Sequence, residues 1–285
     1  MRKKRRNAVL LCLALLVLCA ALTAAYTVVF IWSDDTTPPV ITMAEDLLEV
    51  SVNASDAELL AGVTAADKRD GDVTASLLVQ GVSNLTDDTV TVTYAAFDAA
   101  GNVAKAARTL RYTDYEQPRF GLNAALVYNA GTSMDVLSRL RATDQRDGDI
   151  SDRIKAELVS STGSLAYPGN HQVRFRVTNS LGDTAYMTLP VDVLPAGDYN
   201  AAVVLSDYMV YLPKGREFNA RSYLEGLDTG LSRDLVEDLS LLDISVDSNV
   251  RTGVPGVYSA CYTVSYVRGM SEFVGYSRLI VVVEE

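Results

Sequence analysis

Two copies of an aspartate-rich motif are the residues in this sequence best suited to chemistry. The first copy places three aspartates within six residues, and the second copy repeats all three. They are Asp67, Asp70, Asp72, Asp144, Asp147 and Asp149. Ca²⁺ takes about six to eight oxygen ligands, and closely spaced carboxylates on a loop supply them. The motifs are therefore candidate calcium sites, and Asp98, at a later predicted turn, would add a further carboxylate to the first.

A structural interpretation of the same aspartates is favoured over calcium binding. Aspartate side chains cap turns by accepting hydrogen bonds from nearby backbone N–H groups. In each motif a glycine, Gly71 or Gly148, supplies the tight bend, and an arginine, Arg69 or Arg146, partly neutralises the acidic charge. On this interpretation the protein needs no cofactor, and calcium remains the alternative.

The other reactive residues do not assemble into a known catalytic pattern. Asp228-Thr229-Gly230 matches the core tripeptide of aspartic peptidases, but that chemistry needs two aspartates sharing a proton, and the tripeptide occurs once. The single histidine, His171, is predicted to lie in a solvated turn, and with Cys261 as the one cysteine beyond the apolar N-terminus a zinc site is not expected. We therefore predict that the protein is not an enzyme. Cys261 is expected to be a reduced, half-buried thiol, with an intermolecular disulfide as the alternative.

Tyrosines are concentrated near the C-terminus, where eight of the 15 tyrosines follow residue 198. Tyrosine is favoured at recognition surfaces because it offers contact area and a hydrogen bond at low entropic cost. It is equally at home in the core of a β-sandwich, which is the competing interpretation. Four of these residues are our candidates for a binding surface: Tyr208, Tyr211, Tyr223 and Tyr276.

The two aspartate motifs mark a tandem repeat, because other landmarks recur with them. Pro39 corresponds to Pro118 at a shift of 79 residues, and Gly101 corresponds to Gly182 at a shift of 81. A shift that drifts this little indicates two copies of one domain separated by small loop insertions. The segment from Asp198 onward lacks the motif but closes with a similar layout of strands.

Period-two alternation of apolar residues predicts strands throughout these units. It is clearest at residues 90–96, 172–178 and 258–266. A short helical turn is expected at 56–60. In the third unit a short helix is expected after Ser232, where leucines recur at helical spacing. These leucines are Leu231, Leu235, Leu239 and Leu242.

The N-terminus predicts a membrane anchor. Residues 8–32 contain no charged side chain, and five of the first six residues are basic. A helix of this length exceeds the roughly 30 Å of bilayer hydrocarbon, and a basic flank stays on the cytoplasmic side. Cleavage after Ala25 and lipid attachment at Cys19 are weaker alternatives. The net charge of −11, more negative still beyond the basic tail, argues against nucleic acid as a partner.

Three stretches resemble the bacterial immunoglobulin-like domains of surface proteins, and the hyalin repeat is a similar group. They are residues 36–41, 70–74 and 91–102, which include Thr-Pro-Pro-Val-Ile, Asp-Gly-Asp-Val-Thr and Asp-Ala-Ala-Gly-Asn. The match covers the first domain and most of the second, where Asn179 to Asp183 departs from the pattern. In the third it rests on residues 247–258. The resemblance implies an extracellular, tandem, non-catalytic module that serves as a spacer or a binding unit.

We therefore predict an all-β protein with tandem immunoglobulin-like β-sandwiches after one transmembrane helix. The expected ranges are a cytoplasmic tail at 1–6, a signal-anchor at 7–33 and domains at 37–113, 114–194 and 198–285. The predicted function is a membrane-anchored surface stalk with an interaction or adhesion module at its distal end, contacting cell-wall glycan or a surface protein. The alternative is a structural spacer or a subunit of an envelope assembly, with calcium-stabilised domains as one form of it.

Overall fold

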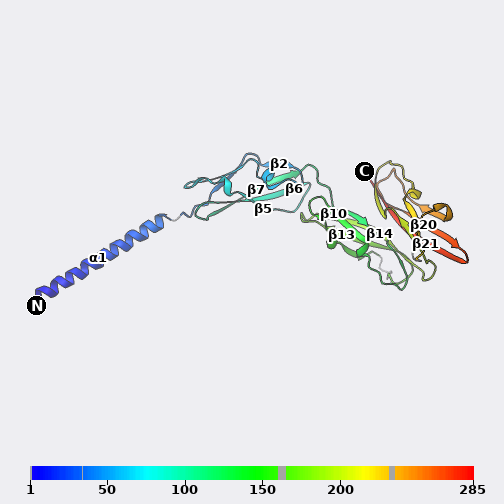
Figure 1. Ribbon diagram of the computed structural model, residues 1–285. Coiled ribbons are helices and arrows are strands. Elements are labelled where there is room, and N and C mark those ends of the chain that lie inside the picture. The colour runs from blue at the N-terminus through cyan, green and yellow to red at the C-terminus, as the bar shows by residue number, and fades with distance from the viewer. Residues whose placement is uncertain (1, 34, 160–164, 231–234) are drawn as a thin grey trace. The chain divides into compact units, whose positions relative to one another are not determined.

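The chain forms one N-terminal helix followed by three immunoglobulin-like β-sandwiches in tandem (Figure 1). The computed structural model describes residues 2–33, 35–159, 165–230 and 235–285. Helix α1 (Arg2–Ser33) contains the stretch Leu10–Val28, which is long and apolar enough to cross a membrane. The predicted all-β class and tandem arrangement are confirmed.

Among the described residues, each sandwich pairs a three-stranded sheet with a four-stranded sheet, and the strand order is the same in all three domains. In the first domain the orders are β1-β3-β4 and β2-β7-β6-β5. The strands are β1 (Val40–Met43), β2 (Leu47–Val50), β3 (Val63–Asp67), β4 (Gly71–Asp72), β5 (Leu78–Val82), β6 (Thr89–Phe97) and β7 (Val103–Tyr112). The predicted helical turn is present as α2 (Asp56–Leu59), which Ser55 and Glu58 close with a capping box.

The second and third domains repeat this order strand for strand. The second has sheets β11-β10-β8 and β12-β13-β14-β9, and the third has sheets β15-β17-β18 and β16-β21-β20-β19. The second contains β8 (Arg119–Leu122), β9 (Val127–Asn129), β10 (Leu140–Asp144), β11 (Gly148–Asp149), β12 (Lys155–Leu158), β13 (Gly169–Thr178) and β14 (Thr184–Leu194). The third contains β15 (Ala202–Leu205), β16 (Met209–Pro213), β17 (Leu224–Asp228), β18 (Leu235–Val236), β19 (Asp243–Ser248), β20 (Gly256–Arg268) and β21 (Ser271–Glu284).

The cores follow from the alternation of apolar residues along the strands. In β6 the side chains of Val90, Val92 and Tyr94 are buried, and the buried Tyr94 hydroxyl donates to the Leu59 carbonyl at 2.7 Å. In β20 the buried residues Ala260, Tyr262 and Val264 alternate in the same way. An alternating strand buries one face and leaves the other to solvent, which is the physical basis of the sandwich.

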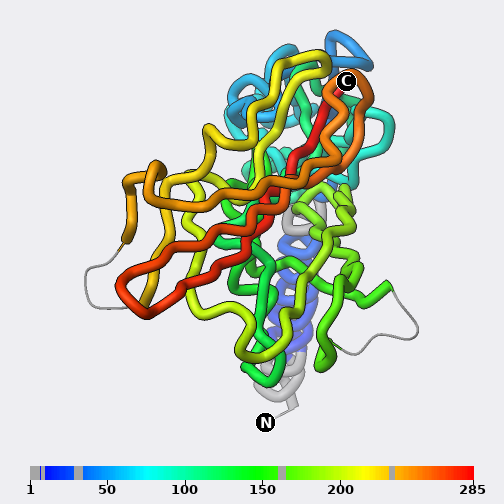
Figure 2. The backbone as a smooth tube through the Cα atoms, turned by 90° about the vertical axis from the view of Figure 1, so that its right-hand side faces the viewer, coloured from blue at the N-terminus to red at the C-terminus, as the bar shows by residue number. Residues whose placement is uncertain are grey.

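The second and third domains form one compact unit, residues 115–285, while residues 1–114 form another. The side chain of Ile280, on β21 of the third domain, belongs to the core cluster of the second domain. Tyr208 packs against the core clusters of both domains. The long hairpin of β20 and β21, orange and red in Figure 2, therefore supplies residues to two cores.

Two local predictions are wrong. The leucine spacing in the third domain does not produce a helix in the described part of that stretch: Leu235–Val236 is strand β18, and Leu239–Leu241 is a single 3-10 turn. Leu231 and Ser232 lie outside the described residues. Pairing of β18 with β17 explains the strand, because cross-strand hydrogen bonds outweigh weak helical spacing. His171 is also not in a turn but in strand β13, paired with Val191.

Candidate metal centre and candidate binding groove

The two aspartate motifs form equivalent hairpin turns. Asp67 ends β3 and pairs with Gly71 of β4, and Asp144 ends β10 and pairs with Gly148 of β11. Both glycines have positive φ, 78° and 71°, a conformation that glycine adopts without strain. The sequence motif thus encodes the same tight turn in both domains.

The first aspartate of each motif caps its turn, as the structural interpretation predicts. Asp67 Oδ1 accepts the backbone N–H groups of Arg69 and Asp70 at 2.6 and 3.0 Å. Asp144 Oδ1 accepts those of Arg146 and Asp147 at 2.9 and 2.8 Å. The bonds from Asp70 and Arg69 lower the pKa of Asp67, so this side chain is ionised at neutral pH.

The remaining motif aspartates are bound to other groups. Asp70 Oδ2 accepts the N–H of Ala99 at 2.8 Å, and Asp72 Oδ1 accepts that of Thr74 at 2.9 Å. Their counterparts have similar partners: Asp147 bonds Ser180 and Arg153, and Asp149 bonds Ser151. The three aspartates of one motif therefore do not converge on a single point, and a calcium site formed by one motif alone stays an untested prediction.

A different set of carboxylates converges in the first domain. Asp35, Asp67 and Asp98 each place one carboxylate oxygen within 4.8 Å of the others. We call this set the Asp67 cluster. Asp35 lies in the segment that leads from α1 into β1, and Asp98 begins the turn between β6 and β7. The side chains of Asp67 and Asp98 are 6% and 8% exposed, so the cluster is largely withdrawn from water.

Two oxygens of the Asp67 cluster are buried without a hydrogen bond from any described residue: Asp35 Oδ2 and Asp67 Oδ2. The other oxygen of Asp35 accepts the Thr37 N–H at 3.0 Å. Each oxygen of Asp98 accepts one hydrogen bond of 2.7 Å from Asn102, Oδ1 from its backbone N–H and Oδ2 from its side-chain amide. Buried carboxylate oxygens without donors are unfavourable, because they have lost water and gained no partner.

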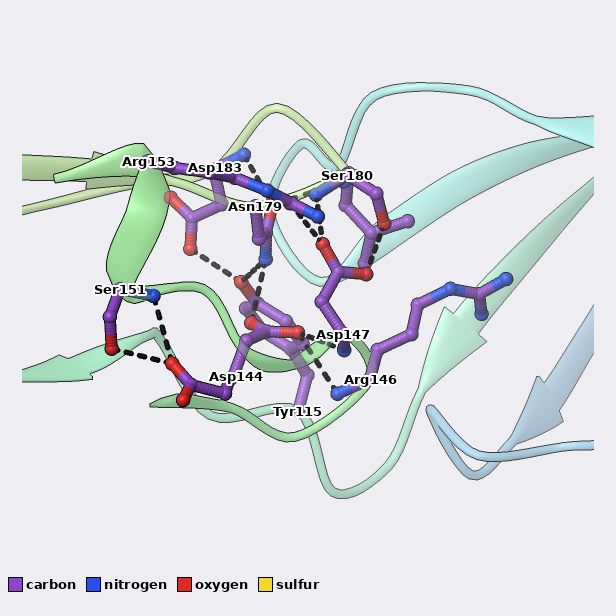
Figure 3. A network of polar contacts seen from close by, with 11 residues as sticks. Tyr115, Asp144, Arg146, Asp147, Ser151, Arg153, Asn179, Ser180 and Asp183 are labelled. Carbon is purple, nitrogen blue, oxygen red and sulfur yellow. Dashed lines mark hydrogen bonds and ion pairs between the residues drawn. The ribbon is translucent and has the colours of Figure 1, made fainter. Parts of the chain in front are cut away.

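In the second domain the equivalent buried oxygen, Asp144 Oδ2, accepts a hydrogen bond from a neutral side-chain amide (Figure 3). Asn179 Nδ2 donates to Asp144 Oδ2 at 2.9 Å and to the Tyr115 hydroxyl at 2.9 Å. That hydroxyl in turn donates to Asp183 Oδ2 at 2.7 Å. We call these four residues the Asp144 network. Burial and the bond to Asp183 raise the pKa of Tyr115, so the phenol keeps its proton and remains a donor.

Two substitutions between the repeats, and one difference in the segment before the first strand, account for this. Asn179 stands where the first domain has Asp98, and Asp183 stands where it has Asn102. Tyr115 lies three residues before Pro118, whereas Asp35 lies four residues before Pro39. Asp98 was expected from the sequence as a further carboxylate, whereas Asp35 and Tyr115 were not. The signal available was the position of each residue just before the proline that opens its domain.

Three of the four candidate binding tyrosines lie between the second and third domains. Tyr211 donates its hydroxyl to the Phe120 carbonyl at 2.8 Å, and burial raises its pKa to about 12. Tyr276 accepts a bond from Arg278 at 3.1 Å, and Arg278 also forms an ion pair of 2.6 Å with the buried Asp192. With Tyr208, which contacts both cores, these side chains hold the two domains together.

The fourth candidate, Tyr223, lines a groove of about 1150 Å³ on the third domain, which we call the Phe218 groove. The rings of Tyr223 and Phe218 are stacked with centroids 5.8 Å apart. Tyr211 also borders the groove. The polar residues that line it are Arg216, Glu217, Asn219, Ser222, Ser248 and Thr252. Stacked aromatic faces beside polar side chains are a common arrangement at ligand sites.

The other reactive residues have local structural contacts. Asp228 Oδ1 accepts the N–H of Gly230 at 2.9 Å and so caps a turn. The His171 ring lies 2.9 Å from the Tyr167 carbonyl. Cys261 is of intermediate exposure, as predicted, and whether its thiol is reduced or forms an intermolecular disulfide stays a prediction.

Comparison with known proteins gives partial sequence matches. No family model matches the chain. An uncharacterized 81.3 kDa protein of Acholeplasma phage L2 is 25% identical over 180 residues, covering 61% of this chain and 22% of the phage protein. Pesticidal crystal protein Cry22Aa of Bacillus thuringiensis is 32% identical over 132 residues, covering 44% of this chain and 16% of that protein. The chain spans less than a quarter of the length of these curated relatives.

Matches among solved structures include mouse cadherin-23 EC22–24, at 13% identity and a TM-score of 0.23, with coverage of 87% of this chain and 99% of that chain. Another contains CBM51-2 in complex with GlcNAc and INT domains from Clostridium perfringens ZmpB, at 15% identity and a TM-score of 0.22, covering 86% and 42% of the two chains. The specific bacterial family stays a prediction, whereas the tandem β-sandwich fold is seen directly.

Proposed function

We propose that this chain is a non-catalytic, membrane-anchored bacterial surface protein whose third domain carries an interaction site. The three sandwiches act as a stalk, and the Phe218 groove is the site that contacts a partner. The partner class that fits the groove is a cell-wall glycan, because sugar rings present C–H faces to aromatic side chains and hydroxyls to polar ones.

The anchor is supported by helix α1. Its stretch Leu10–Val28 is long and apolar enough to cross a membrane, and basic residues precede it. Positive charge retained on the cytoplasmic side would direct the three domains to the outside. Cleavage after Ala25 would instead release them, and the mass of the mature protein distinguishes these outcomes.

The observation that carries the binding proposal is the aromatic pair in the Phe218 groove. Phe218 and Tyr223 are each partly buried against the third-domain core, so their rings are held in place before a ligand arrives. Preorganised aromatic faces lose little entropy on binding. The remaining candidate tyrosines are engaged between the domains, which leaves this groove as the recognition surface we favour.

Glycan binding is tested with the full-length chain in detergent micelles and soluble peptidoglycan fragments as the probe. Phe218→Leu keeps apolar volume but removes the aromatic face, and we expect it to weaken binding about tenfold, equivalent to about 1.4 kcal/mol. Tyr167→Leu is the matched control, because Tyr167 is 70% exposed and is not among the residues lining the groove. Isothermal titration calorimetry measures both variants.

The spacer alternative is the outcome if fragments do not bind the wild-type chain, or if Phe218→Leu binds them equally well. Deleting residues 198–285 is a poorer experiment, because it would remove Ile280 from the core of the second domain. Point variants avoid that damage.

A further inference from the structure

The Asp67 cluster lacks the hydrogen-bond donor that the Asp144 network supplies to its buried aspartate. Both domains bury a turn-capping aspartate, Asp67 or Asp144, at the same 6% exposure. The second domain supplies an amide hydrogen to the free oxygen of Asp144. In the first domain, the free oxygen of Asp67 is buried without a hydrogen bond from any described residue, and Asp98 adds a carboxylate where the amide would be.

A hard divalent cation would give these buried carboxylate oxygens a partner. Calcium binds oxygen ligands at about 2.3–2.6 Å, so two ligands of one ion can lie up to about 5 Å apart. The three carboxylate oxygens of the Asp67 cluster fall within 4.8 Å of one another. A single ion could therefore contact all three, and its positive charge would offset the repulsion between three neighbouring carboxylates.

The donor set favours calcium over other ions. All three side chains offer hard carboxylate oxygen, and zinc prefers nitrogen and sulfur ligands in structural sites. Magnesium usually keeps several waters and takes one or two carboxylates, whereas calcium accepts more protein oxygens in a flexible geometry. Water would complete the coordination of the ion.

We propose that Asp35, Asp67 and Asp98 bind one calcium ion in the first domain, and that the Asp144 network binds none. The bound ion would restrain the segment that precedes the first strand. Asp35 belongs to the leading segment, residues 35–39, which Asn102 already holds through bonds of 2.9 and 3.4 Å to the Asp35 and Thr37 carbonyls. Calcium adds a second attachment of this segment to the domain, directly after the residues of α1.

Calcium binding is tested on the full-length chain in detergent micelles, with CaCl₂ alone as the probe. Isothermal titration calorimetry should give one site, with a Kd in the range of about 10⁻⁴–10⁻³ M that is usual for extracellular modules. Asp98→Asn should weaken binding more than about tenfold, because it removes one of three charged ligands. Asn179 shows that an amide is accommodated at this place in the fold, so loss of folding is not expected.

Asp72→Asn is the matched control. Asp72 lies in the same motif and carries the same charge, but it is not part of the Asp67 cluster. It should keep the wild-type stoichiometry and Kd. Hydrogen exchange followed by mass spectrometry should show calcium-dependent protection in peptides spanning residues 35–43 and 66–73, which localises the ion.

Three results would overturn the proposal: no heat of binding with millimolar calcium, unchanged binding by Asp98→Asn, or equal loss of binding in Asp72→Asn. Equal affinity for magnesium and calcium would overturn the choice of ion. Binding of two calcium ions, one of them sensitive to Asn179→Asp, would overturn the assignment to the first domain alone. The test is independent of whether the Phe218 groove binds glycan.

Discussion

The first and second domains build the same aspartate turn and then complete it in opposite ways. In the first domain the capping Asp67 faces the carboxylates of Asp35 and Asp98. In the second, Asp144 receives a hydrogen bond from Asn179, which also donates to Tyr115. The repeated motif therefore fixes the backbone turn but not the charge around it.

From this difference we infer that one motif can support either a metal site or a self-contained hydrogen-bond network. The deciding residues come from outside the motif, from the turn after the sixth strand of each domain and from the segment before its first strand. Exchange of one carboxylate for one amide changes both the charge and the number of donors. Variants at these positions test whether this exchange of charge and donors distinguishes the two domains.

The largest effect is expected for Asn179→Asp in the second domain. It replaces a donor by a carboxylate beside the buried Asp144, so we expect a loss of about 3 kcal/mol in the free energy of unfolding without calcium. Urea denaturation of the full-length chain in EGTA measures it. The reciprocal Asp98→Asn should stabilise the first domain in EGTA, and destabilisation by both exchanges would contradict the account.

A smaller effect is expected for Tyr115→Phe. The change removes the hydroxyl that accepts from Asn179 and donates to Asp183, so the free energy of unfolding should fall by about 1–2 kcal/mol. Tyr167→Phe, at an exposed site, should leave it unchanged. A Tyr115→Phe chain as stable as wild type would show that the network does not depend on the phenol.

The smallest effect is expected for the pKa of Asp147 and for the pH dependence of stability that follows from it. Burial alone would raise the pKa of Asp147, but hydrogen bonds from Ser180 and Arg153 hold it below its ordinary value. A lowered folded-state pKa contributes stability above the unfolded pKa of about 3.9, and this stability is lost as pH falls through the folded value. Ser180→Ala copies Ala99 of the first domain and should raise the pKa of Asp147.

Carboxyl carbon NMR titration of Asp147 measures this shift directly. In Ser180→Ala the acid-side loss of stability should also be smaller, and complete at a higher pH, than in wild type, because the folded and unfolded pKa values of Asp147 lie closer together. Ser240→Ala is a suitable control, because Ser240 bonds Asp238 in the third domain and not Asp147. An Asp147 titration unchanged by Ser180→Ala would contradict the assigned cause.

Much of the fold could be predicted because it depends on local pattern. The alternation in β6, β13 and β20 reports directly which face is buried. The helix expected from Leu235, Leu239 and Leu242 failed because pairing of β18 with β17 is a contact between strands that spacing alone does not reveal. The shared core was missed for the same reason, since nothing in the sequence near Ile280 marks it as part of the second domain.

The candidate sites could be predicted only in part. The turn-capping role of Asp67 and Asp144 follows from the Asp-x-x-Asp-Gly spacing, because those hydrogen bonds are local. Asp35 lies 32 residues before Asp67, and only the packing of the leading segment against the domain brings them together. The tyrosines also depend on contacts that the sequence does not reveal. Their number near the C-terminus suggested a binding surface, whereas Tyr211 and Tyr276 form hydrogen bonds to the second domain.

The most direct test of the central claim is hydrogen exchange of the full-length chain in calcium and in EGTA, read separately for each domain. The account predicts that calcium slows exchange around Asp67 and in the leading segment, while peptides around Asp144 exchange equally in both conditions. Protection of the Asp144 peptides by calcium, or no protection of the Asp67 peptides, would contradict the claim that one repeat needs a cation and the other supplies its own donors.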